Sequence, residues 1–328
     1  NAASSLKPKQ VLEGISEYYL DFPVNIHRGI HKLSMRASII YQETREKLAK
    51  FIGSKENEVV FTNNSTDSIN LVMYSLYNSQ YFKKDDEIIL SILEHHANLV
   101  PWLFLSKKIG VKLKFVEIKD DFTLDIEDFK DKLSSKTKLV AITHVSNTTG
   151  TIIPIKEIIS LSKKYNCLTL IDASQSAPHL KLNFKELDCD FLVFTAHKML
   201  GPTGLGFLIA KENNLEKFMP YKFGGDMIKN VSITDFSTNS IPFKFEAGTP
   251  NISGVFGFSK AIDYLSDIGL ENIEKQDKLL LDYGIEKLKA IKNLELFNPL
   301  DKNLQSPIFL FRLKGIDCSD LSAILDDM

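Results

Sequence analysis

A lysine in the middle of the chain stands where a covalent reaction with an aldehyde could take place. The apolar run Asp190–Thr195 is followed by His197 and Lys198, and then by a turn rich in glycine and proline. A lysine amine can condense with an aldehyde to give a Schiff base, which requires a partly desolvated amine at a fixed place such as a strand end. Taken alone, Lys198 is more simply explained as a surface lysine beside a glycine turn.

An aspartate ends another apolar run. Leu168–Ile171 precedes Asp172, and a carboxylate at the end of a buried strand is costly unless it is paired. A protonated pyridine nitrogen would be a suitable partner, because the carboxylate would keep its proton in place and the ring would remain an electron sink. Gln175 could donate to the ring oxygen of such a cofactor. Asp172 could equally cap the next helix, and the residue alone does not separate the two interpretations.

Hydroxyl and amide side chains gather where a helix is expected to begin after the run Val59–Phe61. The free N–H groups and the dipole of a helix start suit a phosphate, and we expect Ser65 and Thr66 to make the contacts. A plain helix cap would also explain these residue types and, for this segment alone, is the simpler interpretation.

Two further polar groups follow predicted strands. One imidazole of the pair His95 and His96 could stack on a flat ring, and Asn147 lies just past a strand end. The adjacent histidines do not predict a metal site, because neighbouring side chains diverge and no cysteine or acidic ligands accompany them. His27 and His31 lack a clear third ligand as well.

Short apolar runs alternate with amphipathic segments, and this βαβ pattern predicts a mainly parallel seven-stranded sheet with helices on both faces. The predicted strands are 59–61, 87–90, 112–116, 139–144, 167–172, 190–195 and 206–210. The predicted helices in this region are 37–51, 68–76, 99–109 and 155–165. Ligands bind outside the carboxyl ends of the strands in such a sheet, and each polar group above follows a strand.

The pattern changes after Gly248. Helices are predicted over 259–266, 272–291 and 318–325, and a strand over 308–313. We therefore expect a large α/β domain over residues 1–264 and the start of a smaller α/β domain over 265–328, which stops in mid-element.

Composition narrows the function classes. Lysine plus arginine number 40 and aspartate plus glutamate 42, so no nucleic-acid footprint is expected, and no apolar stretch approaches membrane-spanning length. Cys167, Cys189 and Cys318 form no CxxC pair, which argues against a disulfide framework or a structural zinc site and favours a reducing compartment such as the cytosol. We find no signal peptide, but the chain opens on Asn1, and an organellar location stays open if a targeting segment was trimmed.

Together and in this order, the segments resemble the class V aminotransferase group of fold-type I pyridoxal-phosphate (PLP) enzymes. The resemblance is greatest to the SufS/CsdA-type (group II) cysteine desulfurases and selenocysteine lyases, and it spans essentially the whole chain. Besides the opening segment Asn1–Pro8, the motifs that carry it are His27–His31, Glu94–Asn98, Thr143–Asn147, Thr195–Lys198 and Phe245–Asn251.

The resemblance implies pyridoxal 5′-phosphate as cofactor and gives each polar residue a role. Lys198 would form the Schiff base and later act as base, His95 would stack on the ring, and Asp172 would pair with the pyridine nitrogen. Gln175 would contact the ring hydroxyl, and Asn147 would lie near the substrate carboxylate. The phosphate contacts would come from Ser65, Thr66, Thr195 and His197, together with Thr249, which would reach the phosphate of the partner subunit.

The implied activity is PLP-dependent removal of sulfur from L-cysteine, giving L-alanine and an enzyme persulfide for iron–sulfur cluster assembly. The resemblance also implies a cytoplasmic homodimer with shared active sites and a SufE/SufU-like sulfur acceptor. Selenocysteine lyase, or another class V aminotransferase or lyase, is the alternative, because the cofactor residues are common to all of them. A scaffold that has lost PLP is a hypothesis of a different class, and Lys198, Asp172 and His95 argue against it.

The sequence departs from the family pattern in two places. The expected Arg-x-Gly-x-x-Cys-type stretch and the arginine for the substrate carboxylate are absent before Met328, and truncation is the simplest explanation. None of the three cysteines has that context, and a structural role is favoured for Cys318. Asn63 and Asn64 stand where relatives often carry glycine, and because asparagine tolerates left-handed backbone we expect the phosphate loop to be kept.

Overall fold

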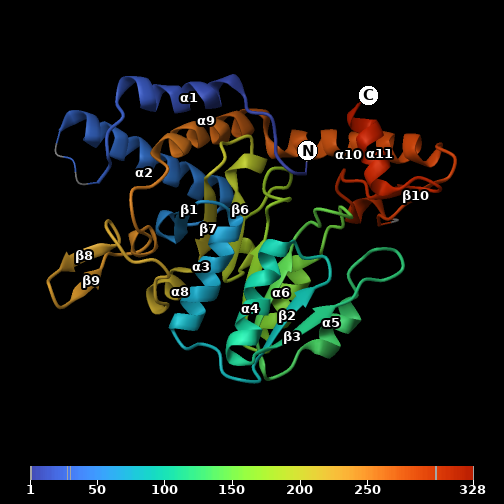
Figure 1. Ribbon diagram of the computed structural model, residues 1–328, viewed down its shortest axis with the longest axis horizontal. Helices are drawn as coiled ribbons and strands as arrows, with labels where there is room; N and C mark the ends of the chain where they lie inside the picture. The colour runs from blue at the N-terminus through green and yellow to red at the C-terminus, as the bar shows by residue number, and fades with distance from the viewer. Residues whose placement is uncertain (1, 28, 30, 300, 328) are drawn as a thin grey trace.

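A seven-stranded sheet forms the centre of the computed structural model, which describes residues 2–27, 29, 31–299 and 301–327 (Figure 1). The strand order is β1-β7-β6-β5-β4-β2-β3. The strands are β1 (Val59–Thr62), β2 (Glu87–Ser91), β3 (Lys112–Val116), β4 (Thr137–Thr143), β5 (Leu168–Asp172), β6 (Phe191–Thr195) and β7 (Gly206–Ala210). All seven predicted strands are present.

The sheet is mainly parallel, as predicted. Strands β6, β5, β4, β2 and β3 run in one direction, and β7 is antiparallel to both of its neighbours, β1 and β6. Gly206, at the start of β7, therefore pairs with Thr62 at the end of β1 and with Thr195 at the end of β6. This topology brings the carboxyl ends of β1 and β6 to the same edge of the sheet.

Helices cover both faces of the sheet, because successive strand residues point to opposite sides. Val59 and Phe61 belong to one buried cluster and Val60 to the other. The first cluster is covered by α1 (Lys9–Asp21), α2 (Lys32–Ile52), α5 (Ile126–Lys132), α6 (Ile155–Lys163), α7 (Phe184–Leu187) and α9 (Ile252–Ile268). The second is covered by α3 (Ser65–Asn78), α4 (Val100–Ile109) and α8 (Glu212–Lys217).

The C-terminal part begins with α10 (Leu270–Lys289), which is followed by an antiparallel pair and by α11 (Cys318–Asp326). The pair consists of β10 (Leu294–Leu296) and β11 (Phe311–Leu313). The strand predicted from residue 308 is therefore too long. Asn298 accepts from Leu310 N (3.1 Å) and donates to Ile308 O (2.8 Å), which holds this backbone out of the ladder.

The predicted domain boundary after residue 264 lies inside α9, whose Leu265 is buried in the first cluster. The helical path breaks only at Gly269, between α9 and α10. The division into two domains stays a prediction, and this break is the nearest place for it.

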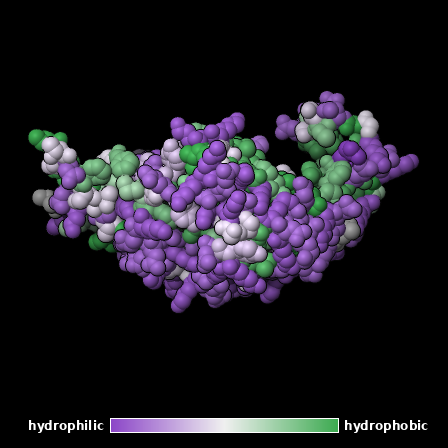
Figure 2. Space-filling model, turned by 90° about the horizontal axis from the view of Figure 1, so that it is seen from below, coloured by the Kyte–Doolittle hydropathy of each residue, from purple (hydrophilic) through white to green (hydrophobic). Residues whose placement is uncertain are grey.

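A β-hairpin extends from the body of the molecule (Figure 1). It consists of β8 (Ile228–Val231) and β9 (Phe236–Thr238), and it exposes Val231, Ile233 and Phe236. The face in Figure 2 is largely hydrophilic, with apolar side chains gathered toward its two ends. None of the helices in the described part of the chain has both the length and the apolar composition that a membrane crossing requires.

Candidate active site

A cavity of about 580 Å³ opens at the carboxyl ends of the strands. The site residues named from the sequence line it, with the exception of Thr195 and Thr249. Those in the cavity are Ser65, Thr66, His95, Asn147, Asp172, Gln175, His197 and Lys198. These side chains therefore converge in one cavity at the carboxyl edge of the sheet, where ligands bind in α/β folds of this kind.

Lys198 lies in a tight turn, Ala196–Lys198, directly after β6. Two backbone bonds fix the turn, from Ala196 N to Leu205 O (3.0 Å) and from Gly201 N to Ala196 O (2.9 Å). Burial lowers the pKa of Lys198, and the charge of Asp172 opposes this effect. A lowered pKa leaves more of the amine neutral and nucleophilic at a given pH. Lys198 is thus not an ordinary surface lysine.

Asp172 ends β5 between two parallel neighbours and is 3% exposed. Its Oδ1 accepts a hydrogen bond from Ser174 N (2.9 Å), but turns follow rather than a helix, so the helix-cap interpretation is wrong. That single local bond does not account for the whole group, because the carboxylate also lines the cavity. Asp172 can therefore offer a buried negative charge to a ligand.

His95 follows β2 and precedes the short turn His96–Asn98. Its Nδ1 accepts from Ala97 N (3.1 Å), so in the neutral ring the proton resides on Nε2. Burial lowers the pKa of His95, with Lys198 and His96 acting in the same direction and Asp172 against them. A neutral imidazole held in one orientation suits stacking on a flat ring.

The start of α3, which the sequence predicts to bind phosphate, forms one side of the cavity. Asn64 caps the helix by accepting from Asp67 N (2.8 Å), which places Ser65 and Thr66 in the first turn, where backbone N–H groups lack helical partners. The loop before α3 does not use left-handed backbone, since Asn64 has an extended φ of −175° and Asn63 is not among the residues with positive φ. Asparagine's tolerance of left-handed backbone is therefore not what shapes this loop.

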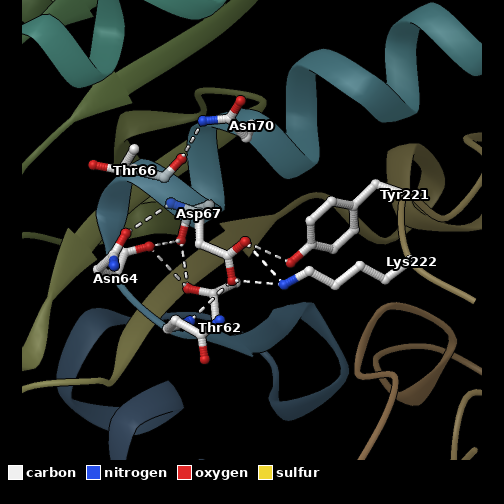
Figure 3. Close-up of polar contacts among 9 residues, drawn as sticks. Thr62, Asn64, Thr66, Asp67, Asn70, Tyr221 and Lys222 are labelled. Carbon is white, nitrogen blue, oxygen red and sulfur yellow. Dashed lines mark hydrogen bonds and ion pairs between the residues drawn. The ribbon is translucent and has the colours of Figure 1, made fainter. Parts of the chain in front are cut away.

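Asp67 anchors the first turn of α3 through a cluster of polar contacts (Figure 3). Its carboxylate accepts from Tyr221 Oη (2.8 Å), Lys222 Nζ (3.0 Å) and Asn63 N (3.0 Å). The Thr66 hydroxyl points away from this cluster in Figure 3. The first turn of α3 is thus tied to the segment after α8 by Asp67, and the Thr66 hydroxyl takes no part in this cluster.

Gly206 is a residue that sequence reasoning missed. A Cβ at this position would lie 2.3 Å from Asn64 Cα, which is closer than real contacts allow. The start of β7 must lack a side chain for the loop before α3 to pass over it. The available signal was a glycine opening a strand, which often marks a close backbone approach.

Gly206→Ala is expected to displace the loop that carries Asn64 and to lower the free energy of unfolding by about 1–3 kcal/mol. The same displacement moves Ser65 and Thr66, so phosphate affinity should fall. Urea unfolding and phosphate titration measure the two effects. Gly224→Ala is the matched control, since a Cβ there meets nothing within 4 Å. Equal stability of both variants would contradict the steric role of Gly206.

The opening segment of the chain lies over the site. Ala2 and Ala3 line the cavity, and Gln175 Nε2 donates to Ala2 O (2.8 Å). Ser5 N, Ser5 Oγ and Lys7 Nζ all donate to the carbonyl of His197, at 3.1, 3.0 and 2.9 Å. These bonds close one side of the cavity next to Lys198.

Two predicted phosphate contacts lie elsewhere. Thr195 is 1% exposed, and its hydroxyl donates to Leu205 O (3.3 Å) rather than facing the cavity. Thr249 lines a second, smaller cavity of about 100 Å³, together with Asp67 and Tyr221. The phosphate contacts expected of Thr195 in this site and of Thr249 in the partner's site therefore stay predictions.

No cysteine of the described chain lines the cavity. Cys167 donates to Ser162 O (3.0 Å), and burial raises its pKa to about 11. Cys189 is buried and its pKa is raised for the same reason, whereas Cys318 is exposed at the start of α11. Cys167 and Cys189 therefore have a structural character.

The histidine motif over residues 27–31 lies partly outside the described residues. His27 packs edge-on against Tyr41 and Phe243, and His31 Nδ1 accepts from Ser34 N (3.3 Å) at the start of α2. In the described part of the chain, histidine, cysteine, aspartate and glutamate side chains form no group that could hold a metal ion.

Comparison with known proteins shows which family this chain resembles. The aminotransferase class-V model matches residues 1–328. A probable cysteine desulfurase of Synechocystis is 44% identical over 99% of this chain and 78% of its own length. The apo structure of a cysteine desulfurase from Thermococcus onnurineus is 40% identical with a TM-score of 0.96, and covers 100% of this chain and 81% of its own. The cysteine desulfurase CsdA of Escherichia coli is 32% identical with a TM-score of 0.91, over 99% and 81%.

The chain belongs to the aminotransferase class-V family. Its fold is that of the fold-type I cysteine desulfurase structures, a central seven-stranded sheet flanked by helices. The predicted family and fold class are both confirmed.

Proposed function

We propose that the protein is a PLP-dependent cysteine desulfurase that converts L-cysteine to L-alanine and transfers the sulfur. The observation that carries the proposal is the convergence of Lys198, Asp172 and His95 in one cavity with the start of α3. Relatives named cysteine desulfurase, with up to 44% identity across nearly the whole chain, support it.

The donor set of the cavity suits PLP. An amine with a lowered pKa, a buried carboxylate and a helix start match an aldehyde, a ring nitrogen and a phosphate respectively.

Each residue then has a defined task. PLP, when bound, supplies an electron sink for a carbanion at the substrate Cα. Lys198 Nζ would hold the cofactor through its aldehyde and could act as the base for the proton on the substrate Cα. Asp172 keeps a proton on the ring nitrogen by accepting its hydrogen bond. His95 would stack against the ring, and Ala2 and Ala3 would restrict the access of water.

The proposal extends to assembly and partners. We infer a homodimer in which Thr249 contacts the phosphate of the partner site, supported by its position outside this chain's own cavity. The exposed apolar side chains of the hairpin β8–β9 support the proposed assembly, because such side chains suit a contact between subunits. We further propose a persulfide intermediate, a SufE/SufU-like acceptor, iron–sulfur cluster assembly in the cytoplasm, and a small C-terminal domain that begins near Gly269.

The test is the reaction itself. The full-length protein is incubated with PLP, L-cysteine and a thiol reductant, and alanine and sulfide are measured. Equal amounts of alanine and sulfide support the proposal. Alanine formed only from selenocysteine would instead favour a selenocysteine lyase. A protein that binds PLP but forms alanine from neither substrate would exclude both.

A further inference from the structure

Glu94 is a carboxyl group beside the proposed active site to which no role has been given. It directly precedes His95 in the loop after β2. Its Oε1 accepts from Ser91 Oγ (2.5 Å) and from Thr143 N (3.0 Å), and its Oε2 accepts from Asn98 Nδ2 (2.7 Å). Three donors from three segments thus fix one side chain.

These bonds join the loop of His95 to the end of β4. Thr143 is the last residue of β4, lines the cavity and pairs with Asp172 of β5. Glu94 therefore links the loop after β2 to the strand end that lies beside Asp172. The loop is also held by the bond from Ile92 N to Val116 O (3.1 Å), and the bond from Thr143 N to Glu94 is the one that reaches the end of β4.

The orientation of Asn98 is also determined. Asn98 and Trp102 are fully buried, and Trp102 Nε1 donates to Asn98 Oδ1 (3.0 Å). Because the indole can only donate, the amide oxygen must face Trp102 and the amide N–H must face Glu94. Glu94 is accordingly the acceptor that completes this network, and His95 lies within the loop that the network holds.

The charge of Glu94 is coupled to the cavity. Burial raises its pKa to about 7, the charge of Asp172 acts in the same direction, and the hydrogen bonds of Ser91, Thr143 and Asn98 oppose them. The other titratable groups at this place are His95 and Lys198, both of which also interact with Asp172. Asp172 is thus the charge that Glu94 shares with His95 and Lys198, so Glu94 is connected to these groups through Asp172.

We propose that Glu94 is a positioning residue that orients the loop of His95 and whose ionisation tunes the proton affinity of the site around Asp172. The inference rests on the proposed function. An ionised Glu94 adds negative charge next to Asp172 and so favours the protonated forms of nearby groups. Removing the negative charge of Glu94 should therefore lower the pKa of the groups near Asp172.

Glu94→Gln keeps the size and can keep the acceptor for Ser91 and Thr143, but it removes the charge and the acceptor for Asn98. In the PLP-loaded protein, we expect the pH midpoint of the cofactor's visible absorbance to fall by about one unit. Glu87→Gln is the matched control: Glu87 begins the same strand β2, is 8% exposed, and bonds Ser134 Oγ (2.5 Å) and Lys114 Nζ (2.7 Å) far from the cavity. The Glu87→Gln variant should leave the pH midpoint of the visible absorbance unchanged.

A purely structural role would give a different result. If Glu94→Gln lowers the melting temperature but keeps the wild-type pH midpoint, the proposal is overturned. Should the variant fail to fold, ¹³C NMR titration of glutamate carboxyls in the wild type decides, and an ordinary pKa for Glu94 overturns the proposal. That titration does not need PLP, so it separates failure of this inference from failure of the proposed function, which would appear as wild-type protein that does not bind PLP.

Discussion

If the proposed function holds, Lys198→Ala is expected to abolish the covalent attachment of PLP and to lower cysteine desulfurase activity by a factor of at least about 10³, because the proposal gives one side chain the roles of attachment point and base. PLP should still enter the cavity, since Asp172 and the start of α3 are retained. Borohydride reduction followed by mass spectrometry measures the covalent link, and alanine formation measures the activity.

Lys211→Ala is the matched control for this substitution. Lys211 also directly follows a strand of the central sheet, β7, but its Nζ pairs with Asp188 (2.7 Å) instead of facing the cavity. Its variant should retain the covalent adduct and the activity. A Lys198→Ala protein that still carried PLP covalently would show that another lysine is the attachment point.

A buried ion pair holds the segment of Thr249 against the sheet. Arg45 of α2 and Glu246 are 1% and 8% exposed, and their Nη1–Oε1 and Nη2–Oε2 distances are both 2.8 Å. Glu246 Oε1 also accepts from Phe61 N (2.7 Å), and the Arg45 guanidinium lies 4.3 Å from the centre of the Phe61 ring. The pair thus joins α2, β1 and the segment that leads to Thr249.

Arg45→Leu should lower the free energy of unfolding by about 3–5 kcal/mol, because it leaves the Glu246 carboxylate buried without its partner. Adding Glu246→Gln should recover part of the loss, since glutamine carries no charge and still accepts from Phe61 N. Urea unfolding of the single and double variants measures both effects.

Arg36→Leu provides the comparison with an exposed pair. Arg36 contacts Glu17 at 2.8 Å, but the two side chains are 54% and 33% exposed. Solvent screens such a pair, so the expected loss is at most about 1 kcal/mol. Equal losses for Arg36→Leu and Arg45→Leu would mean that burial of the charge is not what makes the Arg45 pair important.

Local sequence determined the strands and most of the residues that meet in the cavity. The apolar runs are buried on both faces of the sheet and therefore read as continuous hydrophobic stretches, as in β4 and β6. Because parallel strands end at one edge, the polar residues after them had to converge, and Lys198, Asp172 and His95 do so.

The roles of Gly206 and Glu94 depend on tertiary contacts that local sequence patterns do not predict. The role of Gly206 depends on the backbone of Asn64, more than a hundred residues earlier in the chain, and no periodicity records that contact. In the sequence Glu94 has the pattern of an ordinary acidic loop residue, and only the fold shows that Thr143 and Asn98 donate hydrogen bonds to it. Sequence determines which groups are present at each strand end, whereas long-range contacts decide which of them are buried, paired and charged.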